Sequence, residues 1–227
     1  TDYDIKQLVA QLQKVSEARI CLFGPPGTGK TAFAKHVAKT LGKTALIKRA
    51  SDIFGSFVGE TERNMAKMFK QAHEENAVLI LDEADSFLRS RQFAKQNWEV
   101  TVINEMLTQL ENFNGLFFAS TNLMEQLDEA SLRRFDCKIK FDFLKPEQTM
   151  QLIQQTCKLL NIQEAIHLIK VENIPYLTAG DFATILRQSR LRPIVSVGEL
   201  MTRLKAEVSV KKQYTARSSM GFLALTA

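Results

Sequence analysis

The sequence predicts an α/β fold, in which a five-stranded parallel sheet lies between helices, followed by a small all-helical domain. Over the first part of the chain, short apolar segments alternate with segments of helical period, which is the pattern of a layered α/β protein. Residues 78–81 are all apolar, as expected for a strand that is covered on both faces. After Leu144 only helical patterns follow. The sequence therefore indicates two domains, residues 1–144 and residues 145–227.

The order of elements follows from the spacing of the apolar residues. The first domain begins with an amphipathic helix expected over residues 4–16. Apolar segments then predict strands at residues 19–23, 44–48, 78–81, 116–120 and 138–143. Segments of helical period predict helices at residues 31–41, 60–74 and 98–111, and Gly42 is expected to close the first of these. In the second domain the same period predicts helices at residues 146–160, 180–190 and 197–210.

The composition is that of a globular protein. The 227 residues are 45% hydrophobic and 24% charged, and the net charge of +5 is too small to indicate nucleic acid without a localised patch. No apolar run is long enough to span a membrane and no signal peptide opens the chain, so we expect a cytoplasmic protein. Cys21, Cys137 and Cys157 are widely spaced, which favours buried reduced thiols over a metal or redox pair. The chain starts at Thr1 without a methionine, as a fragment would.

A glycine-rich segment after the first strand predicts a phosphate-binding loop. Residues 24–31 read GPPGTGKT, which matches the P-loop pattern between a strand and a helix. Glycines let backbone N–H groups converge on phosphate oxygens, and the helix N-terminus favours anions. Lys30 suits the β- and γ-phosphates, and Thr31 suits Mg²⁺. The residues expected to bind the nucleotide are Pro26, Gly27, Thr28, Gly29, Lys30 and Thr31.

Two adjacent carboxylates follow the all-apolar strand, in the sequence VLILDEAD over residues 78–85. The carboxyl ends of parallel strands are where ligands bind in α/β folds. Asp82 suits a direct or water-mediated contact with Mg²⁺, and Glu83 suits the polarisation of an attacking water. Asp85 is expected to be structural or to begin a helix. Together with the P-loop, this pair predicts a P-loop NTPase fold with a nucleoside triphosphate and Mg²⁺ as ligands.

A third polar segment follows the fourth strand, where residues 116–122 read LFFASTN. Two interpretations stay open on chemistry alone. The polar pair that ends this segment could contact the γ-phosphate or the attacking water, or it could cap the following turn.

With these three motifs in place, the chain resembles the AAA-type P-loop ATPase family, and the resemblance covers nearly its whole length. The resemblance implies that Asn122 is the sensor residue of the fourth strand. Residues 127–136, LDEASLRRFD, are similar to the arginine-finger region, in which arginines reach the ATP of a neighbouring subunit. Arg133 and Arg134 are adjacent, as in relatives such as katanin and spastin, so which of them makes the main γ-phosphate contact stays open.

Two further segments resemble parts of the same family. Residues 55–60, GSFVGE, are similar to the pore loop, which implies that Phe57 and Val58 project into a central channel; apart from the family, a buried loop phenylalanine is equally plausible. Residues 178–182, TAGDF, resemble the start of the lid helix, which implies that Gly180 lies near the adenine. No arginine stands at the start of that helix, so a second sensor arginine is not expected.

The favoured hypothesis is that the chain is one subunit of a homo-oligomeric ring, expected to be a hexamer closed by a head-to-tail interface. Such a motor unfolds, extracts or disassembles protein substrates by threading them through its pore. Substrates and adaptors would be chosen by an N-terminal region that these residues do not include.

Two alternatives belong to other classes. One is a nucleic-acid-handling or loader-type ATPase, with a second channel loop built from Arg89, Arg91 and Lys95 beside Phe93 and Trp98. The other is a scaffold that binds ATP without turnover. The scaffold is disfavoured by the intact set Lys30, Asp82, Glu83 and Arg133.

Overall fold

The computed structural model describes residues 5–57, 59–89, 97–163 and 174–220, and for residues 6, 97, 126 and 212–220 it describes the backbone alone. The chain forms two compact units, Thr1–Phe141 and Asp142–Ala227. The sequence predicts this boundary slightly later, after Leu144. The difference arises because the fifth strand ends at Lys140, earlier than its apolar pattern indicates.

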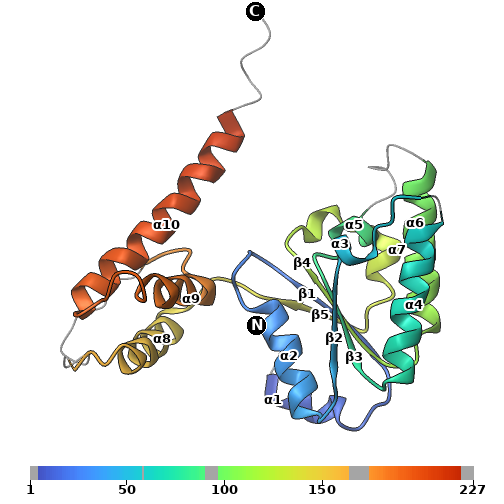
Figure 1. Cartoon of the computed structure of the whole chain (residues 1–227), viewed down its shortest axis with the longest axis horizontal. Coiled ribbons are helices and arrows are strands. Elements are labelled where there is room, and N and C mark those ends of the chain that lie inside the picture. Colours follow the sequence, from blue (N-terminus) through green and yellow to red (C-terminus); the bar gives the residue numbers. More distant parts are fainter. Residues whose placement is uncertain (1–4, 58, 90–96, 164–173, 221–227) are drawn as a thin grey trace, which may run out of the picture. The chain divides into compact units, whose positions relative to one another are not determined.

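The first unit is built on five strands that all pair in parallel, in the order β2-β3-β4-β1-β5. The strands are β1 (Ala18–Phe23), β2 (Ala45–Arg49), β3 (Val78–Asp82), β4 (Leu116–Thr121) and β5 (Cys137–Lys140). This arrangement confirms the predicted five-stranded parallel sheet. Because β3, β4 and β1 are neighbours, their carboxyl ends lie next to one another along one edge (Figure 1).

Helices cover both faces of this sheet, with α1 and α2 on one side and α4 and α6 on the other (Figure 1). The longer helices are α1 (Ile5–Leu12), α2 (Lys30–Thr40), α4 (Glu60–Glu74) and α6 (Asn97–Asn112). Among the described residues of this unit, four shorter elements are given no bounds by the sequence analysis, because one helical turn shows no apolar period. They are α3 (Ala50–Ile53), α5 (Asp85–Leu88), α7 (Glu129–Leu132) and the 3-10 turn η2 (Met124–Gln126).

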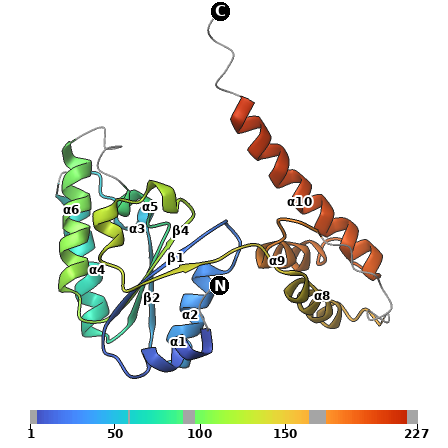
Figure 2. The same ribbon diagram turned by 180° about the vertical axis from the view of Figure 1, so that it is seen from behind.

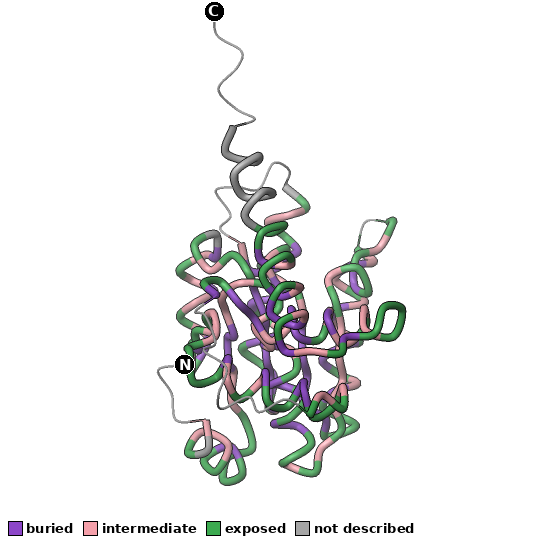
Figure 3. Tube along the Cα trace, turned by 90° about the vertical axis from the view of Figure 1, so that its left-hand side faces the viewer, coloured by how far each residue is buried: buried purple, intermediate pink, exposed green. Residues whose placement is uncertain are grey.

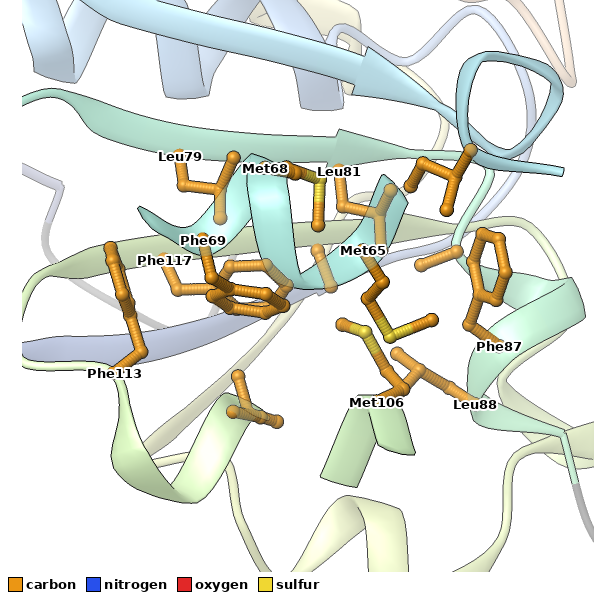
Figure 4. Close-up of a cluster of buried hydrophobic side chains, with 14 of the residues drawn as sticks. Met65, Met68, Phe69, Leu79, Leu81, Phe87, Leu88, Met106, Phe113 and Phe117 are labelled. Carbon is orange, nitrogen blue, oxygen red and sulfur yellow. The ribbon is translucent and has the colours of Figure 1, made fainter. Parts of the chain in front are cut away.

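The alternation of side chains along β3 divides the apolar interior into two cores. Val78 and Ile80 pack with α1 and α2, whereas Leu79 and Leu81 pack with α4, α5 and α6. Figure 3 shows the buried positions in purple. Figure 4 shows the second core, in which Leu79 and Leu81 face side chains from the covering helices. Those labelled from the helices are Met65, Met68, Phe69, Phe87, Leu88 and Met106.

Helices are the regular elements of the second unit among its described residues, with no strand between 142–163 or 174–220. Its helices are α8 (Pro146–Leu159), α9 (Ala179–Gln188) and α10 (Val197–Met220), and Figure 2 shows them from behind. Their apolar sides form a core of their own. At the start of α9, the buried Asp181 accepts a hydrogen bond from the Thr178 N–H and pairs with Lys211 of α10. No described helix of the chain is long and apolar enough to cross a membrane.

The three cysteines lie in different surroundings. Cys21 and Cys157 are buried, as the sequence predicts, while Cys137 is partly exposed at the start of β5. Burial raises the pKa of the Cys21 thiol to about 12. A thiol with that pKa stays protonated near neutral pH and reacts slowly.

Gly24 occupies a backbone position that no other residue fits. Its φ is +134°, and a Cβ built on it would lie 1.8 Å from the carbonyl oxygen of Phe141. The Phe141 N–H donates to the carbonyl of Phe23 at 2.7 Å, which holds the two backbones together. Gly42, just past the end of α2, offers a contrast, because its φ of +66° is left-handed but a Cβ added there would meet no atom within 4 Å.

We expect Gly24→Ala to destabilise the first unit much more than Gly42→Ala. The second change costs about 1 kcal/mol, because alanine resists a left-handed backbone. The first costs about 3 kcal/mol or more, because either the backbone of residue 24 or the Phe141 carbonyl must also move. Urea unfolding followed by circular dichroism measures both. Equal losses at the two positions would show that Phe141 does not crowd Gly24.

Candidate active site

The three polar segments found in the sequence meet at one edge of the sheet. The P-loop follows β1, Asp82 ends β3, and Asn122 follows β4. Since these strands are parallel neighbours, their carboxyl ends point the same way. The structure therefore brings together side chains that are up to 92 positions apart in the sequence.

The P-loop joins β1 to the first turn of α2. Gly27 and Gly29 have φ values of +77° and +96°, and Gly29 is the N-cap of α2. No side chain caps the N-terminus of this helix, and the Thr28 hydroxyl donates instead to the Pro25 carbonyl at 2.8 Å. The first N–H groups of α2 therefore stay uncovered by the loop. That arrangement fits the phosphate groups of a nucleotide.

Lys30 is the first residue of α2, and only 7% of it is exposed. Its ammonium donates to the carbonyls of Gly24 at 2.7 Å and Pro25 at 3.0 Å, and to Asn122 Oδ1 at 2.7 Å. Burial lowers the pKa of Lys30, and the nearby carboxylates, Asp82 foremost, act in the opposite direction. The ammonium therefore connects the P-loop with the end of β4.

Asp82 holds the oxygen atoms that suit a magnesium ion. Its Oδ1 accepts a hydrogen bond from the Thr31 hydroxyl at 2.9 Å, and a short one from Ser120. Carboxylate and hydroxyl oxygens are hard ligands of the kind Mg²⁺ takes, with phosphates and waters filling the rest of its shell. The two residues predicted for the metal, Thr31 and Asp82, are thus neighbours, and their donor set fits the ion.

Glu83 sits on a strained backbone next to Asp82. Its φ is +56°, which is uncommon for any residue other than glycine, asparagine or aspartate. The following residue is held in place, since the Ala84 N–H donates to the Ser120 carbonyl at 2.9 Å. Among the described residues, the exposed carboxylate of Glu83 has no hydrogen-bond or ion-pair partner. Strain of this kind gathers at functional sites, where it costs on the order of 1–3 kcal/mol.

Thr121, the last residue of β4, and Asn122, which follows it, make different contacts. The Thr121 hydroxyl accepts from the Leu123 N–H at 2.9 Å and donates to Asp85 Oδ1, so it is the residue that caps the turn. Asn122 is exposed and accepts from Lys30. Asp85 begins α5, one of the two roles that its position in the sequence suggests. The cap of this turn therefore belongs to Thr121, whereas Asn122 bonds the P-loop lysine.

Arg133 and Arg134 follow α7 and lie in different surroundings. The Arg133 side chain is 81% exposed, and its one ion pair, with Glu129, is 3.8 Å long. The Arg134 side chain is 27% exposed; its Nε lies 2.6 Å from a Glu111 carboxylate oxygen, and its guanidinium donates to the Ala130 carbonyl. No described contact joins either arginine to Lys30.

The loop before α4 presents an aromatic side chain to solvent. Phe57 is 79% exposed, so the alternative of a buried loop phenylalanine is wrong. The Glu60 carboxylate accepts from the N–H groups of Ser56 at 2.8 Å and Phe57 at 3.2 Å, which fixes the loop backbone. At the base of the loop, Phe54 stacks on Phe87 of α5 with ring centroids 4.9 Å apart. Val58 lies outside the described residues.

The remaining predicted positions belong to other elements or lie outside the described residues. Gly180 is the second residue of α9, in the second unit. In the second channel loop, Arg91, Phe93 and Lys95 lie outside the described residues. Arg89 pairs with Glu99 of α6.

The comparison with family models agrees with this site. Residues 20–143, more than half of the chain, match the model of AAA, the ATPase family associated with various cellular activities. This chain belongs to the AAA family. The match confirms the resemblance seen in the three motifs, and with it the expectation of an ATP-hydrolysing domain.

Relatives of this AAA domain come from several functional settings. Fidgetin-like protein 1 of Caenorhabditis elegans is 31% identical over 191 residues, which cover 79% of this chain and 32% of that protein. The vesicle-fusing ATPase of Arabidopsis thaliana is 32% identical over 151 residues, or 59% of this chain and 20% of that protein. A Bifidobacterium adolescentis protein, described as an AAA ATPase forming ring-shaped complexes, is 32% identical over 154 residues, or 60% and 30%. The chain thus spans less than a third of each relative's length.

Three residues that bond to the candidate site or fix the Phe57 loop are missing from the sequence-based set. Ser120 binds Asp82, Thr121 binds Asp85, and Glu60 fixes the Phe57 loop. Ser120 and Thr121 belong to the STN segment, but their partners depend on how β4 aligns with β3. Glu60 had a local signal, since an acidic residue that begins a helix can reach back to preceding N–H groups.

Proposed function

We propose that this chain is the ATPase module of a ring-forming motor, expected to be a hexamer, that remodels proteins by drawing them through a central pore. The observation that carries the catalytic part is the meeting of Lys30, the Thr31–Asp82 pair and Glu83, whose carboxylate has no partner in the described part of the chain, at one sheet edge. The relatives named for vesicle fusion and for ring-shaped complexes support a remodelling ring.

In this proposal each residue has one task in hydrolysis. Lys30 and the first N–H groups of α2 bind the β- and γ-phosphates, and Thr31 and Asp82 hold Mg²⁺. The ion neutralises charge on the phosphates when it is bound. Glu83 accepts a proton from the attacking water, because its carboxylate is exposed and has no described partner. Asn122 orients that water or the γ-phosphate.

Glu83→Gln should keep ATP binding and lose turnover, by about 10²- to 10⁴-fold, because only the proton acceptor is removed. Lys30→Ala should instead weaken ATP binding by about 10- to 100-fold, because a charged hydrogen bond to phosphate is lost. Fluorescent-nucleotide titration and phosphate release measure the two effects. Glu147→Gln, an exposed glutamate of the second unit, is the matched control. Wild-type turnover by Glu83→Gln would refute the assignment.

The surroundings of the two arginines favour Arg133 as the one that acts on a neighbouring subunit. Arg134 is occupied within its own unit by Glu111 and the Ala130 carbonyl. Arg133 extends into solvent with only a long ion pair to Glu129, so little is lost when it turns to a partner. We therefore infer that Arg133 contacts the γ-phosphate across the interface, while Arg134 holds the segment that presents it.

Arg133→Ala should spare ATP binding by the isolated chain and lower turnover by the assembled protein by about 10³-fold or more, as arginine fingers do. Arg133→Lys should restore little, because an ammonium lacks the planar fork. Arg134→Ala should show its main effect as a lower melting temperature. Turnover assays and thermal melts of the three variants separate these outcomes, and the reverse pattern would exchange the two roles.

A mixing experiment tests whether the site is shared between subunits. Arg133→Ala and Glu83→Gln proteins are each inactive, but a mixed ring contains interfaces with an intact Glu83 on one side and an intact Arg133 on the other. Regained turnover on mixing supports action across the interface. Turnover could also fail to return although the two proteins co-assemble and the monomeric Arg133→Ala chain binds ATP as tightly as the wild type. That result would point to strict coupling around the ring.

Phe57 should matter for substrate rather than for nucleotide. The full-length protein is expected to turn over ATP faster with an unfolded polypeptide, and Phe57→Ala should lose this stimulation while Phe57→Tyr keeps most of it. Leu191→Ala is the control, because Leu191 is 91% exposed but lies in the second unit. Stimulation by single-stranded nucleic acid and not by polypeptide would favour the loader-type alternative.

A further inference from the structure

The last residue of β4 controls the turn that carries Asn122. Thr121 is buried, and its hydroxyl oxygen takes part in two hydrogen bonds at once, as a hydroxyl can. It accepts from the Leu123 N–H at 2.9 Å and donates to Asp85 Oδ1. Asn122 lies between Thr121 and Leu123, so these bonds fix the backbone on both sides of it.

The acceptor in this arrangement belongs to the acidic segment. Asp85 is two residues after Glu83 and begins α5. Between them, the Ala84 N–H donates to the Ser120 carbonyl at 2.9 Å. One backbone bond and two side-chain bonds, from Ser120 to Asp82 and from Thr121 to Asp85, therefore join the segment that contains Glu83 to the segment that contains Asn122.

The Thr121–Asp85 hydrogen bond suits a positioning role. A hydrogen bond to an ionised carboxylate is shorter and stronger than one between neutral groups. Catalytic groups must be held within about 0.5 Å of their working geometry by partners that are themselves fixed. Among the described residues, no side chain bonds Glu83, and Lys30 is the one side chain that bonds Asn122. Their positions therefore depend on the backbone that carries them.

We infer that Thr121 and Asp85 are positioning residues for ATP hydrolysis, whose hydrogen bond sets the place of Asn122 relative to Glu83. The inference rests on the roles proposed for those two residues. Thr121 and Asp85 themselves act without touching the nucleotide. They differ from Thr31, whose hydroxyl donates to Asp82 and which is proposed to bind Mg²⁺.

Thr121→Val keeps the shape of the side chain and removes the hydroxyl. In the full-length protein it should lower kcat about 10- to 100-fold, the loss that follows misplacement of a catalytic group by about 1 Å. The KM for ATP should change much less, because Lys30 and the P-loop are intact. Thr121→Ser should recover most of kcat, and Asp85→Asn part of it, because its amide oxygen still accepts. Thr149→Val, a buried threonine of α8, should leave kcat unchanged.

A double variant shows whether Thr121 acts through Asn122. If it does, Thr121→Val should change kcat by less than about threefold in an Asn122→Ala background, since coupled residues are not additive. Independent, multiplicative losses would overturn the inference. So would a KM that rises in step with the fall in kcat, or a Thr121→Ser variant as inactive as Thr121→Val.

The same set separates this inference from the role of Asn122. If Asn122→Ala loses turnover while Thr121→Val is normal, the positioning role fails and the role of Asn122 stands. If Asn122→Ala turns over ATP at the wild-type rate, both fail.

Discussion

Burial of the central strands on both faces limits where this chain can place polar chemistry. β3 and β4 divide their side chains between two apolar cores, so a charge along their length would be buried without a partner. Polar groups are tolerated only where these strands end, and Asp82, Ser120 and Asn122 lie there. The strand order then brings these ends beside the P-loop. The site is thus a consequence of the layering as much as of its motifs.

The sequence alone predicts those parts of the fold and site that depend on local patterns. The all-apolar β3, the period of α4 and the spacing of the P-loop are such patterns, and the structure has the corresponding elements. Contacts between distant segments could not be predicted. Nothing local shows that Ser120 binds Asp82, because that contact depends on the alignment of β4 with β3. Arg133 and Arg134 are also indistinguishable in sequence, since their difference comes from Glu111, on another helix.

Three residues proposed to act on water or on another molecule share one property. Glu83, Arg133 and Phe57 are all exposed. Within the described structure the Glu83 carboxylate has no partner, Arg133 has a long ion pair, and Phe57 bonds through its backbone alone. The residues proposed to hold nucleotide or metal are instead tied to their neighbours, as Lys30 is to the P-loop and Asp82 to Thr31. The proposed nucleotide and metal ligands are thus held by bonds within the chain, whereas the other three side chains are free to contact water or another molecule. A ring of such subunits would complete each site with a neighbour's residue.

The left-handed backbone of Glu83 has an evolutionary consequence. Glycine would relax this position, and asparagine would tolerate it better than glutamate does, so selection for stability alone would replace the carboxylate. Screens that reward expression or heat resistance without assaying turnover would accumulate changes at this residue and yield more stable proteins that lack the proposed proton acceptor. At this position the residue that best stabilises the fold differs from the residue that the proposed reaction needs.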